Sequence, residues 1–390
     1  MLYLTLESFQ KTGGVQTASR ILAKSLAELM VSKGSTFYMM SLCDQTEAVD
    51  PRYIAGGSFK GFAYKRIPFA LAAIRKGVSS GTIVISHINL LPVAFFIKLL
   101  APKSRVILIA HGKEVWSVLK EWQERFIRTK VEVWAVSNFT KAKMVANYGL
   151  NEDKIQVLNN CLDPYFKLPV VFDKPAYLLE RYVGELRTPI IFTMSRMDIH
   201  ERNKGYDQVL DCLCSLSIDF PDLKYIIAGK ITEPERKRIL KKVKDLKVEK
   251  RVILPGFISA EELTDHYLLC DVFIMPSTKE GFGLVFLEAL ACGRPVIAGN
   301  KDGSVDALRN GELGALVDPA ATQEIQYALL SALQKPRNQH AQALQALTFK
   351  HFHFEQYKLQ VNTLLQSALK PNTHQIQILL FLLSIHLIMN

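Results

Sequence analysis

Short runs of continuous apolar residues alternate with stretches of helical period along most of the chain. The runs at 82–88, 105–111 and 131–137 are apolar almost throughout, and a helical pattern such as NFTKAKMVANYG at 138–149 follows each. Strands that are apolar on both faces and separated by helices are typical of a parallel sheet covered on both sides. The pattern therefore predicts an α/β domain, with LYLTL at 2–6 as its buried first strand.

The same rhythm starts again after residue 185. Strand-like apolar runs recur at 189–196, 224–229, 251–256, 271–277 and 295–299. Between the two series, the segment 159–175 carries three prolines and has no clear period. Such a segment is typical of a crossing between domains. We therefore predict two doubly wound, Rossmann-like domains.

The end of the chain is less regular. Residues 351–370 follow a helical pattern, and 378–389 form a run of 12 apolar residues interrupted by Ser384 and His386. A membrane-spanning helix needs about 20 apolar residues, so this run is too short to span. It favours a docking or interfacial segment over an anchor, and a tail without function remains an alternative.

The charge is unevenly distributed. The chain of 390 residues has a net charge of +11, and residues 1–170 carry 22 Lys and Arg against 12 Asp and Glu, whereas residues 171–390 carry 26 against 25. The excess predicts an anionic partner or surface for the first domain. We expect no nucleic-acid partner, since the chain shows no known binding module or aromatic-basic signature.

The cysteines indicate the compartment and argue against a metal. Six are present, without a Cys-x2-Cys pair or a His spacing that would hold a metal ion, and no secretory leader precedes the first strand. We interpret them as reduced thiols of a cytoplasmic protein.

The stretch KEGFGLVFLEALACG at 279–293 carries the clearest chemistry. A strand is expected to end near Ser277, and a glycine loop then leads into a helix at 284–292 that Gly293 and Pro295 close. Unpaired amides and the helix dipole at such a place suit a phosphate. Glu280 and Glu288 would repel a phosphate but can accept hydrogen bonds from sugar hydroxyls. Hexose, diphosphate and ribose in a nucleotide sugar have this layout.

The segment PSTKEGFGLVFLEALACGRPVIA at 276–298 resembles the donor-site signature of the retaining family 4 glycosyltransferases with the GT-B architecture. The alternative is an ordinary strand-loop-helix with two solvated acids. The resemblance implies an acceptor-binding domain at 1–170 and a nucleotide-sugar-binding domain at 171–345. It further implies a helix at 346–370 that packs back toward the first domain, with 371–390 as an apolar tail.

The resemblance also implies the site residues. Glu280 would orient the donor hexose and Glu288 the ribose, while Arg196 and Lys204 would hold the phosphates and stabilise the leaving group. His111 would contact the acceptor and the transferring sugar, with His87 as a less supported candidate. The remaining donor-binding residues would be Gly13, Gly14, Gly281, Phe282, Gly283 and Leu284. The alternative for Arg196 and Lys204, each taken alone, is a solvated surface cation, and for His111 it is a structural histidine. The alternative for Gly13 and Gly14 is that they only begin a helix.

The implied reaction moves a sugar from a nucleoside diphosphate to an acceptor hydroxyl, with no cofactor and no metal. A lipid-linked, lipopolysaccharide or exopolysaccharide saccharide is the expected acceptor. Residues 59–77 mix five cations with Phe59, Phe62, Tyr64 and Phe69, which suits peripheral binding to the anionic inner face of the membrane. A solvated loop and helix is the alternative there. Two other functions stay open, namely another GT-B enzyme, such as an epimerase or a phosphorylase, and a basic scaffold of the same fold without turnover.

Overall fold

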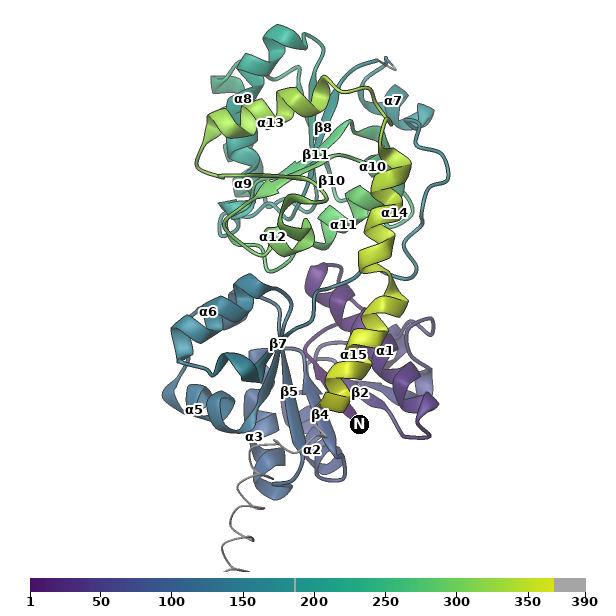
Figure 1. The fold of residues 1–390 in the computed structure, drawn as a ribbon, viewed down its shortest axis with the longest axis vertical. Coiled ribbons are helices and arrows are strands. Elements are labelled where there is room, and N and C mark those ends of the chain that lie inside the picture. The colour runs from purple at the N-terminus through teal and green to yellow at the C-terminus, as the bar shows by residue number, and fades with distance from the viewer. Residues whose placement is uncertain (186, 368–390) are drawn as a thin grey trace, which may run out of the picture.

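Two parallel β-sheets form the centres of two lobes, which lie one above the other in Figure 1. The computed structural model describes residues 1–185 and 187–367. The lower sheet has the order β3-β2-β1-β4-β5-β6-β7 and the upper sheet the order β10-β9-β8-β11-β12-β13. Every pairing between their strands is parallel. The prediction of two doubly wound domains is confirmed.

The strands of the lower sheet are β1 (Leu2–Thr5), β2 (Tyr38–Ser41), β3 (Phe59–Gly61), β4 (Thr82–Ile85), β5 (Arg105–Ala110), β6 (Glu132–Ala135) and β7 (Ile155–Val157). Those of the upper sheet are β8 (Ile190–Met194), β9 (Lys224–Ala228), β10 (Val252–Gly256), β11 (Val272–Met275), β12 (Val296–Gly299) and β13 (Ala315–Val317). Every apolar run that was expected to be a strand contains one. The strands β2, β3, β7 and β13 were not predicted, because three or four residues are too few for a clear apolar pattern.

The helices of the lower lobe are α1 (Gly14–Ser32), α2 (Arg66–Val78), α3 (Leu91–Leu100), α4 (Lys113–Trp116), α5 (Glu121–Lys130) and α6 (Asn138–Tyr148). Those after the crossing are α7 (Ala176–Tyr182), α8 (Tyr206–Asp219), α9 (Glu233–Asp245), α10 (Leu263–Leu269), α11 (Leu284–Ala291), α12 (Ser304–Ala307), α13 (Thr322–Leu333), α14 (Ala341–Phe352) and α15 (Phe354–Ser367). Short 3-10 turns occur at Thr46–Ala48, Gly56–Ser58, Ile88–Leu90, Glu152–Lys154, Arg202–Lys204 and Arg309–Gly311.

The register of the lower sheet aligns the loops that matter for function. Ile107 of β5 lies between Val84 of β4 and Glu132 of β6, so the three strands end at the same edge. The loops that follow β1, β4, β5 and β6 therefore open along one edge of the sheet, since all strands are parallel. This edge faces the upper lobe (Figure 1).

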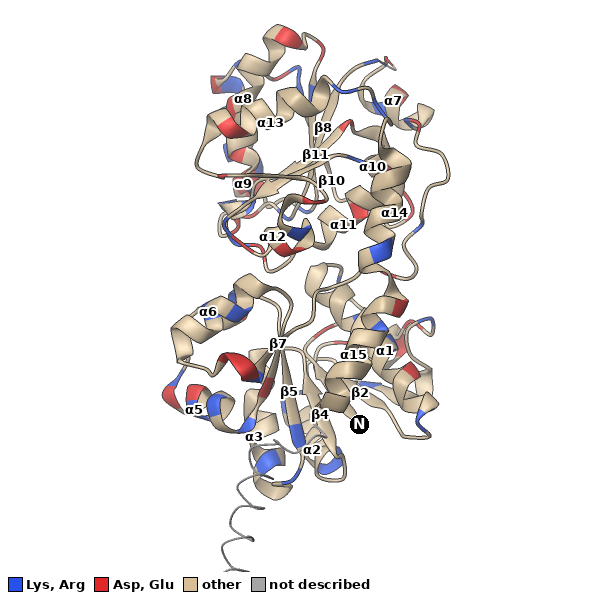
Figure 2. Ribbon diagram, in the orientation of Figure 1, with Lys and Arg blue, Asp and Glu red and all other residues tan. Residues whose placement is uncertain are grey.

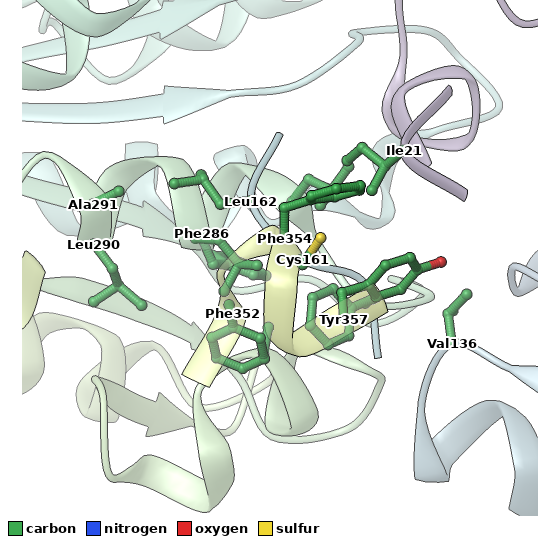
Figure 3. Close-up of a cluster of buried hydrophobic side chains, with 14 of the residues drawn as sticks. Ile21, Val136, Cys161, Leu162, Phe286, Leu290, Ala291, Phe352, Phe354 and Tyr357 are labelled. Atoms are coloured by element: carbon green, nitrogen blue, oxygen red, sulfur yellow. The ribbon is translucent and has the colours of Figure 1, made fainter. Parts of the chain in front are cut away.

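The chain crosses between the lobes twice, and both crossings meet in one apolar cluster (Figure 3). The first crossing contributes Cys161 and Leu162, and the second is the break between α14 and α15. The amide of Leu162 donates to the carbonyl of Phe352 at 2.9 Å, which ties the crossings together. His353 is extended at the break, with φ −80° and ψ 156°.

The last two helices consequently belong to different lobes. Helix α14 packs against α11 of the upper lobe, and α15 packs against α1 of the lower lobe. Lys358 Nζ lies 2.8 Å from Glu28 Oε2 of α1, and the Arg105 guanidinium donates to the carbonyls of Leu364 and Leu365 at 2.9 and 2.8 Å. The end of the described chain is thus fastened to the first domain (Figure 1).

The structure corrects the expectation for residues 59–77. Phe59, Phe62 and Phe69 are buried in the cores of the lower lobe, and Tyr64 alone among the four aromatics is exposed. The aliphatic side chains of α2 are instead on the surface, with Ile67 74% and Leu71 65% exposed. Among the described residues, none of the helices is both long and apolar enough to cross a membrane. The apolar run at 378–389 lies outside the described residues.

Candidate active site

The main chains of the two lobes touch at two glycines. His111 and Gly112 follow β5 of the lower sheet, and Gly281 lies in the loop between β11 and α11 of the upper sheet. A Cβ added to Gly281 would lie 1.9 Å from the carbonyl oxygen of His111. Gly112 has φ +145°, and a Cβ there would lie 3.1 Å from the Cα of Gly281. Both positions therefore require glycine, since a side chain would push the lobes apart.

A buried carboxylate holds the upper-lobe loop in place. Asp302, which is 1% exposed, accepts hydrogen bonds from the Glu280 amide and the Ser277 hydroxyl at 2.7 Å, and from the Ser304 amide at 2.9 Å. The Gly303 amide also donates to the Glu280 carbonyl at 2.8 Å. The main chain of Glu280 is thus fixed at both its amide and its carbonyl group. Burial raises the pKa of Asp302, although these hydrogen bonds oppose that shift.

Glu114 holds the facing loop of the lower lobe. Its Oε1 accepts hydrogen bonds from the amides of His111 at 2.6 Å and of Gly112 at 3.1 Å. The imidazole of His111 is buried, and its Nε2 has no hydrogen-bond partner within the described protein. Burial lowers the pKa of His111 to about 4, so the ring is neutral near pH 7. A neutral imidazole can exchange hydrogen bonds with a sugar hydroxyl but cannot serve as a fixed cation.

Lys204 and Glu280 form a short ion pair at the same place. Lys204 Nζ donates to Glu280 Oε2 at 2.5 Å, and both side chains are largely buried. Burial alone would lower the pKa of Lys204, but the attraction and hydrogen bond of Glu280 outweigh it and raise the pKa. The cation and the acid that the sequence predicted are therefore adjacent.

Arg196 lies farther into solvent and pairs with a residue that the sequence analysis did not consider. Its guanidinium binds both carboxylate oxygens of Glu201. Lys113 from the lower lobe approaches the same carboxylate, with 3.8 Å between Nζ and Oε1. Burial raises the pKa of Glu201, but Arg196, Lys113 and Lys204 outweigh that effect and lower it. Glu201 is thus a counter-ion shared by Arg196 and Lys113.

Glu288 occupies a separate position one helical turn inside α11. It is half-buried, and its Oε2 accepts a hydrogen bond from the Tyr267 hydroxyl at 2.7 Å. Burial raises the pKa of Glu288 to about 7, and the charge of Asp163 adds to this effect. Asp163 belongs to the first crossing, so Glu288 also faces the junction of the lobes.

The glycine loop before α11 contributes its main chain more than its side chains. The ring of Phe282 is buried and lies 5.9 Å from that of Phe352, centroid to centroid, and Leu284 is buried as well. Gly283 adopts φ +93° directly before the helix, which begins with no side-chain cap. Free amides and the helix dipole therefore remain available for an anion at this point.

Gly13 and Gly14 begin α1 at the edge that also carries His111. The helix has neither a side-chain cap nor an acid in its first turn. The loop before it is fixed by Asp44, whose buried carboxylate accepts hydrogen bonds from the amides of Ser8 and Gln10 at 2.7 and 2.9 Å. A Cβ added to Gly14 would meet no atom within 4 Å, and one added to Gly13 would meet Gln16 of the same helix. Two strand spacings, roughly 10 Å, separate β1 from β5.

The structure thus pairs Lys204 with Glu280 and brings the main chain of His111 against Gly281 of the same loop. Arg196 pairs with Glu201, Glu288 lies one turn into α11, and Gly13–Gly14 lie at the start of α1. Lys113, Asp302 and Asp44 were not among the site residues predicted from the sequence. Lys113 directly follows His111 and Gly112, and Asp302 and Asp44 follow the ends of β12 and β2. That signal was present but weak. No group of acids, histidines or cysteines suited to a metal occurs in the described part of the chain.

Part of the chain matches a known protein family. Residues 184–347 match the family model of the glycosyl transferases group 1. A GDP-mannose-dependent alpha-(1-6)-phosphatidylinositol monomannoside mannosyltransferase from Mycolicibacterium smegmatis is 31% identical over 244 residues, which are 60% of this chain and 62% of the relative. The chain thus matches somewhat less than two thirds of that relative's length.

Solved structures share the fold over nearly the whole chain. Anabaena HepE, in complex with UDP and glucose, aligns with a TM-score of 0.76 at 19% identity, over 94% of this chain and all of that one. Sucrose-phosphate synthase from Thermosynechococcus elongatus aligns with a TM-score of 0.73 at 20% identity, over 95% and 99% of the two chains. At these identities the likeness concerns the fold alone.

The contact at Gly281 can be tested by adding one methyl group. We expect Gly281→Ala to lower the free energy of unfolding by about 1–3 kcal/mol, because the new Cβ overlaps the carbonyl of His111. We also expect small-angle scattering to show a larger radius of gyration as the lobes separate. Gly81→Ala is the control, since a Cβ there meets no atom within 4 Å. Unchanged scattering and stability for Gly281→Ala would contradict the close contact.

The neutral state of His111 predicts a pH dependence of stability. The unfolded chain takes up a proton on His111 below its ordinary pKa of 6.5, whereas the folded chain does so only near 4. Stability should therefore fall as the pH falls from 6.5 to 4, by about 3 kcal/mol for this residue. Glu288 contributes with the opposite sign, so the quantity to measure is the difference between the parent and His111→Gln in urea unfolding at pH 7 and pH 4. The control is His340→Gln, which changes an exposed histidine and should lose as much unfolding free energy between pH 7 and pH 4 as the parent does. If the imidazole of His111 were already protonated in the folded chain at pH 7, His111→Gln would also lose as much as the parent.

Proposed function

We propose that this chain, which matches the glycosyl transferases group 1 over residues 184–347 and has the GT-B fold, is a family 4-like glycosyltransferase. It would transfer a sugar from a nucleoside-diphosphate sugar to an acceptor hydroxyl with retention at the anomeric carbon. The observation that carries the proposal is the ion pair of Lys204 and Glu280 in the loop that touches the main chain of His111, a residue with a neutral imidazole. A cation for a phosphate, an acid for sugar hydroxyls and an uncharged hydrogen-bonding ring meet where two lobes touch.

In the proposed mechanism the donor lies across the loop before α11. Glu280 orients the hydroxyls of the hexose, and Glu288, one turn deeper, orients those of the ribose. The diphosphate between them contacts Lys204, Arg196 and the amides at the start of α11. The helix dipole and the two cations would stabilise the negative charge that develops as the diphosphate departs.

Retention follows if both partners react on one face of the sugar. The bond between the anomeric carbon and the diphosphate oxygen breaks, and the electron pair stays on that oxygen. The same oxygen takes the proton of the acceptor hydroxyl, whose oxygen forms the new bond to the anomeric carbon. This scheme needs no covalent nucleophile, no cofactor and no metal. The neutral ring of His111 would hold the hexose or the acceptor hydroxyl in line.

For the acceptor we propose a lipid-linked saccharide, or one of a lipopolysaccharide or exopolysaccharide. The Mycolicibacterium relative is named for a transfer to a phosphatidylinositol monomannoside, which is a glycolipid. A glycolipid acceptor requires the enzyme to reach a membrane surface. We therefore propose peripheral association with the inner face of the cell membrane through the lower lobe.

The surface proposed for this association is formed by α2, α3 and the start of α5. Phe95 of α3 lies against Trp122 of α5, with 6.0 Å between ring centroids, and Leu99 and Leu100 of α3 are exposed. Helices α2 and α3 are in contact, so Ile67 and Leu71 extend the same surface. Lys and Arg residues occur on all three helices (Figure 2). Exposed apolar residues beside cations suit an anionic bilayer.

Activity should depend on the charge of Glu280. We expect Glu280→Gln to reduce kcat for sugar transfer or donor hydrolysis roughly 10²–10³-fold, because it removes the partner of Lys204 and a hydrogen-bond acceptor for the hexose. The donor for the assay is the GDP- or UDP-sugar that raises the melting temperature most. Glu355→Gln, an exposed acid on α15, is the control. Equal rates for Glu280→Gln and the parent would favour a scaffold, and an absorbance band of bound pyridoxal would favour a phosphorylase.

Membrane association should depend on the exposed aliphatic residues of α2. We expect the full chain to float with phosphatidylglycerol vesicles at low salt and to be released at high salt, since the charge contribution is screened. The double variant Ile67→Ser/Leu71→Ser should bind at least about tenfold more weakly, because two apolar side chains no longer enter the bilayer. Leu359→Ser changes a residue of similar exposure on α15 and should bind like the parent. Flotation of the double variant equal to the parent would exclude this surface.

A further inference from the structure

Lys113 reaches across the cleft from the lower lobe. It is the first residue of the short helix α4, directly after the glycine that touches Gly281, and 41% of its side chain is exposed. Its Nζ donates to the side-chain oxygen of Asn203 at 3.3 Å and lies 3.8 Å from Glu201 Oε1. Both partners belong to the loop between β8 and α8 of the upper lobe. The lower lobe thus adds a cation to a group of charges that otherwise belongs to the upper lobe.

The charges around Lys113 do not balance. Lys113, Arg196 and Lys204 stand against the two carboxylates of Glu201 and Glu280. Burial lowers the pKa of Lys113, and the repulsion by Lys204 lowers it further, although Glu201 and Glu280 oppose both effects. The three cations lie close enough to repel one another, although Asp198 also acts on Arg196 and Asp302 on Lys204. An anion with two or more charges would relieve this repulsion.

The contacts of Lys113 are weak enough to be exchanged. The 3.3 Å hydrogen bond to Asn203 is long, and the 3.8 Å distance to Glu201 is an ion pair without a close hydrogen bond. By contrast, Lys204 is bound at 2.5 Å and Arg196 binds its carboxylate through two nitrogens. Lys113 is therefore the cation of the three that can turn toward a ligand at the smallest cost in lost contacts.

We propose that Lys113 is a further catalytic residue, a ligand of the departing diphosphate contributed by the lower lobe. This inference rests on the proposed sugar transfer and names one more group for it. As the bond between the anomeric carbon and the diphosphate oxygen breaks, the electron pair stays on that oxygen, and the ammonium of Lys113 stabilises the added charge on the β-phosphate. Glu201 is the counter-ion that the diphosphate displaces from Lys113.

A consequence is that the diphosphate joins the lobes. Lys204 and Arg196 hold the ligand from above, and Lys113 holds it from below, next to the contact of Gly112 with Gly281. A nucleoside monophosphate ends before the β-phosphate, so it cannot use Lys113 in this way. The contribution of Lys113 should accordingly be specific for diphosphates.

The test measures nucleotide binding by the full chain with isothermal titration calorimetry. The probes are GDP, UDP and ADP with the corresponding monophosphates. For the diphosphate that binds the parent, we expect Lys113→Ala to raise Kd roughly 10- to 100-fold, the range that a charge-assisted hydrogen bond gives. The monophosphate should change less than about threefold. Lys113→Arg should recover most of the affinity, and kcat for donor turnover should fall with Lys113→Ala and recover with Lys113→Arg.

The control is Lys103→Ala, which removes the same charge from the other end of strand β5 and should bind like the parent. Equal weakening of diphosphate and monophosphate, or none, would overturn the role of Lys113 while leaving the proposed sugar transfer intact. The same holds if Lys103→Ala has the effect of Lys113→Ala. A parent chain that binds none of the three diphosphates would overturn the proposed function together with this inference. Melting curves of each variant identify any that fails to fold.

Discussion

The close approach of Gly112 and Gly281 is the constraint on which the site depends. Two main chains from different lobes come within van der Waals distance only because neither residue carries a side chain. That contact brings together the loops that follow β5 and β11, which carry His111 and Glu280. Carboxylates fix the loops on both sides, the half-buried Glu114 below and the buried Asp302 above. The geometry of the cleft is thus determined by backbone packing, and the charged side chains are placed by it.

Electrostatics then divides the cleft into parts with different chemistry. Lys204 and Glu280 are both largely buried and keep each other charged, because each would be costly to bury alone. His111, buried without a charged partner, stays neutral. The neutral imidazole of His111 can form hydrogen bonds with hydroxyl groups, and the cation of the ion pair can bind phosphate oxygens. This division suits a ligand in which a sugar is joined to a diphosphate.

The arrangement of the lobes is supported at a second place, away from the cleft. The two crossings of the chain share one apolar cluster, and α15 returns to the lower lobe after the break at His353. Phe352 packs on Phe282, so the crossing directly contacts the glycine loop before α11. A movement of the lobes about the crossings would therefore be transmitted to the loop that carries Glu280. The buried ring of Phe282 belongs to this connection and offers a ligand its main chain alone.

The sequence by itself determined the two doubly wound domains and most strands, because continuous apolar runs between amphipathic helices leave few other solutions. The resemblance of residues 276–298 to a donor-site signature also indicated Glu280, Lys204 and His111 as candidates. Sequence order could not show that Lys113 faces Glu201 or that Asp302 holds Glu280, because these contacts join segments 88 and 22 residues apart. It also misjudged Phe59, Phe62 and Phe69, whose burial depends on which face of the lobe the helices cover. Only the tertiary structure decided these points, because distance across a cleft and burial against a neighbouring element are properties of packing rather than of local pattern.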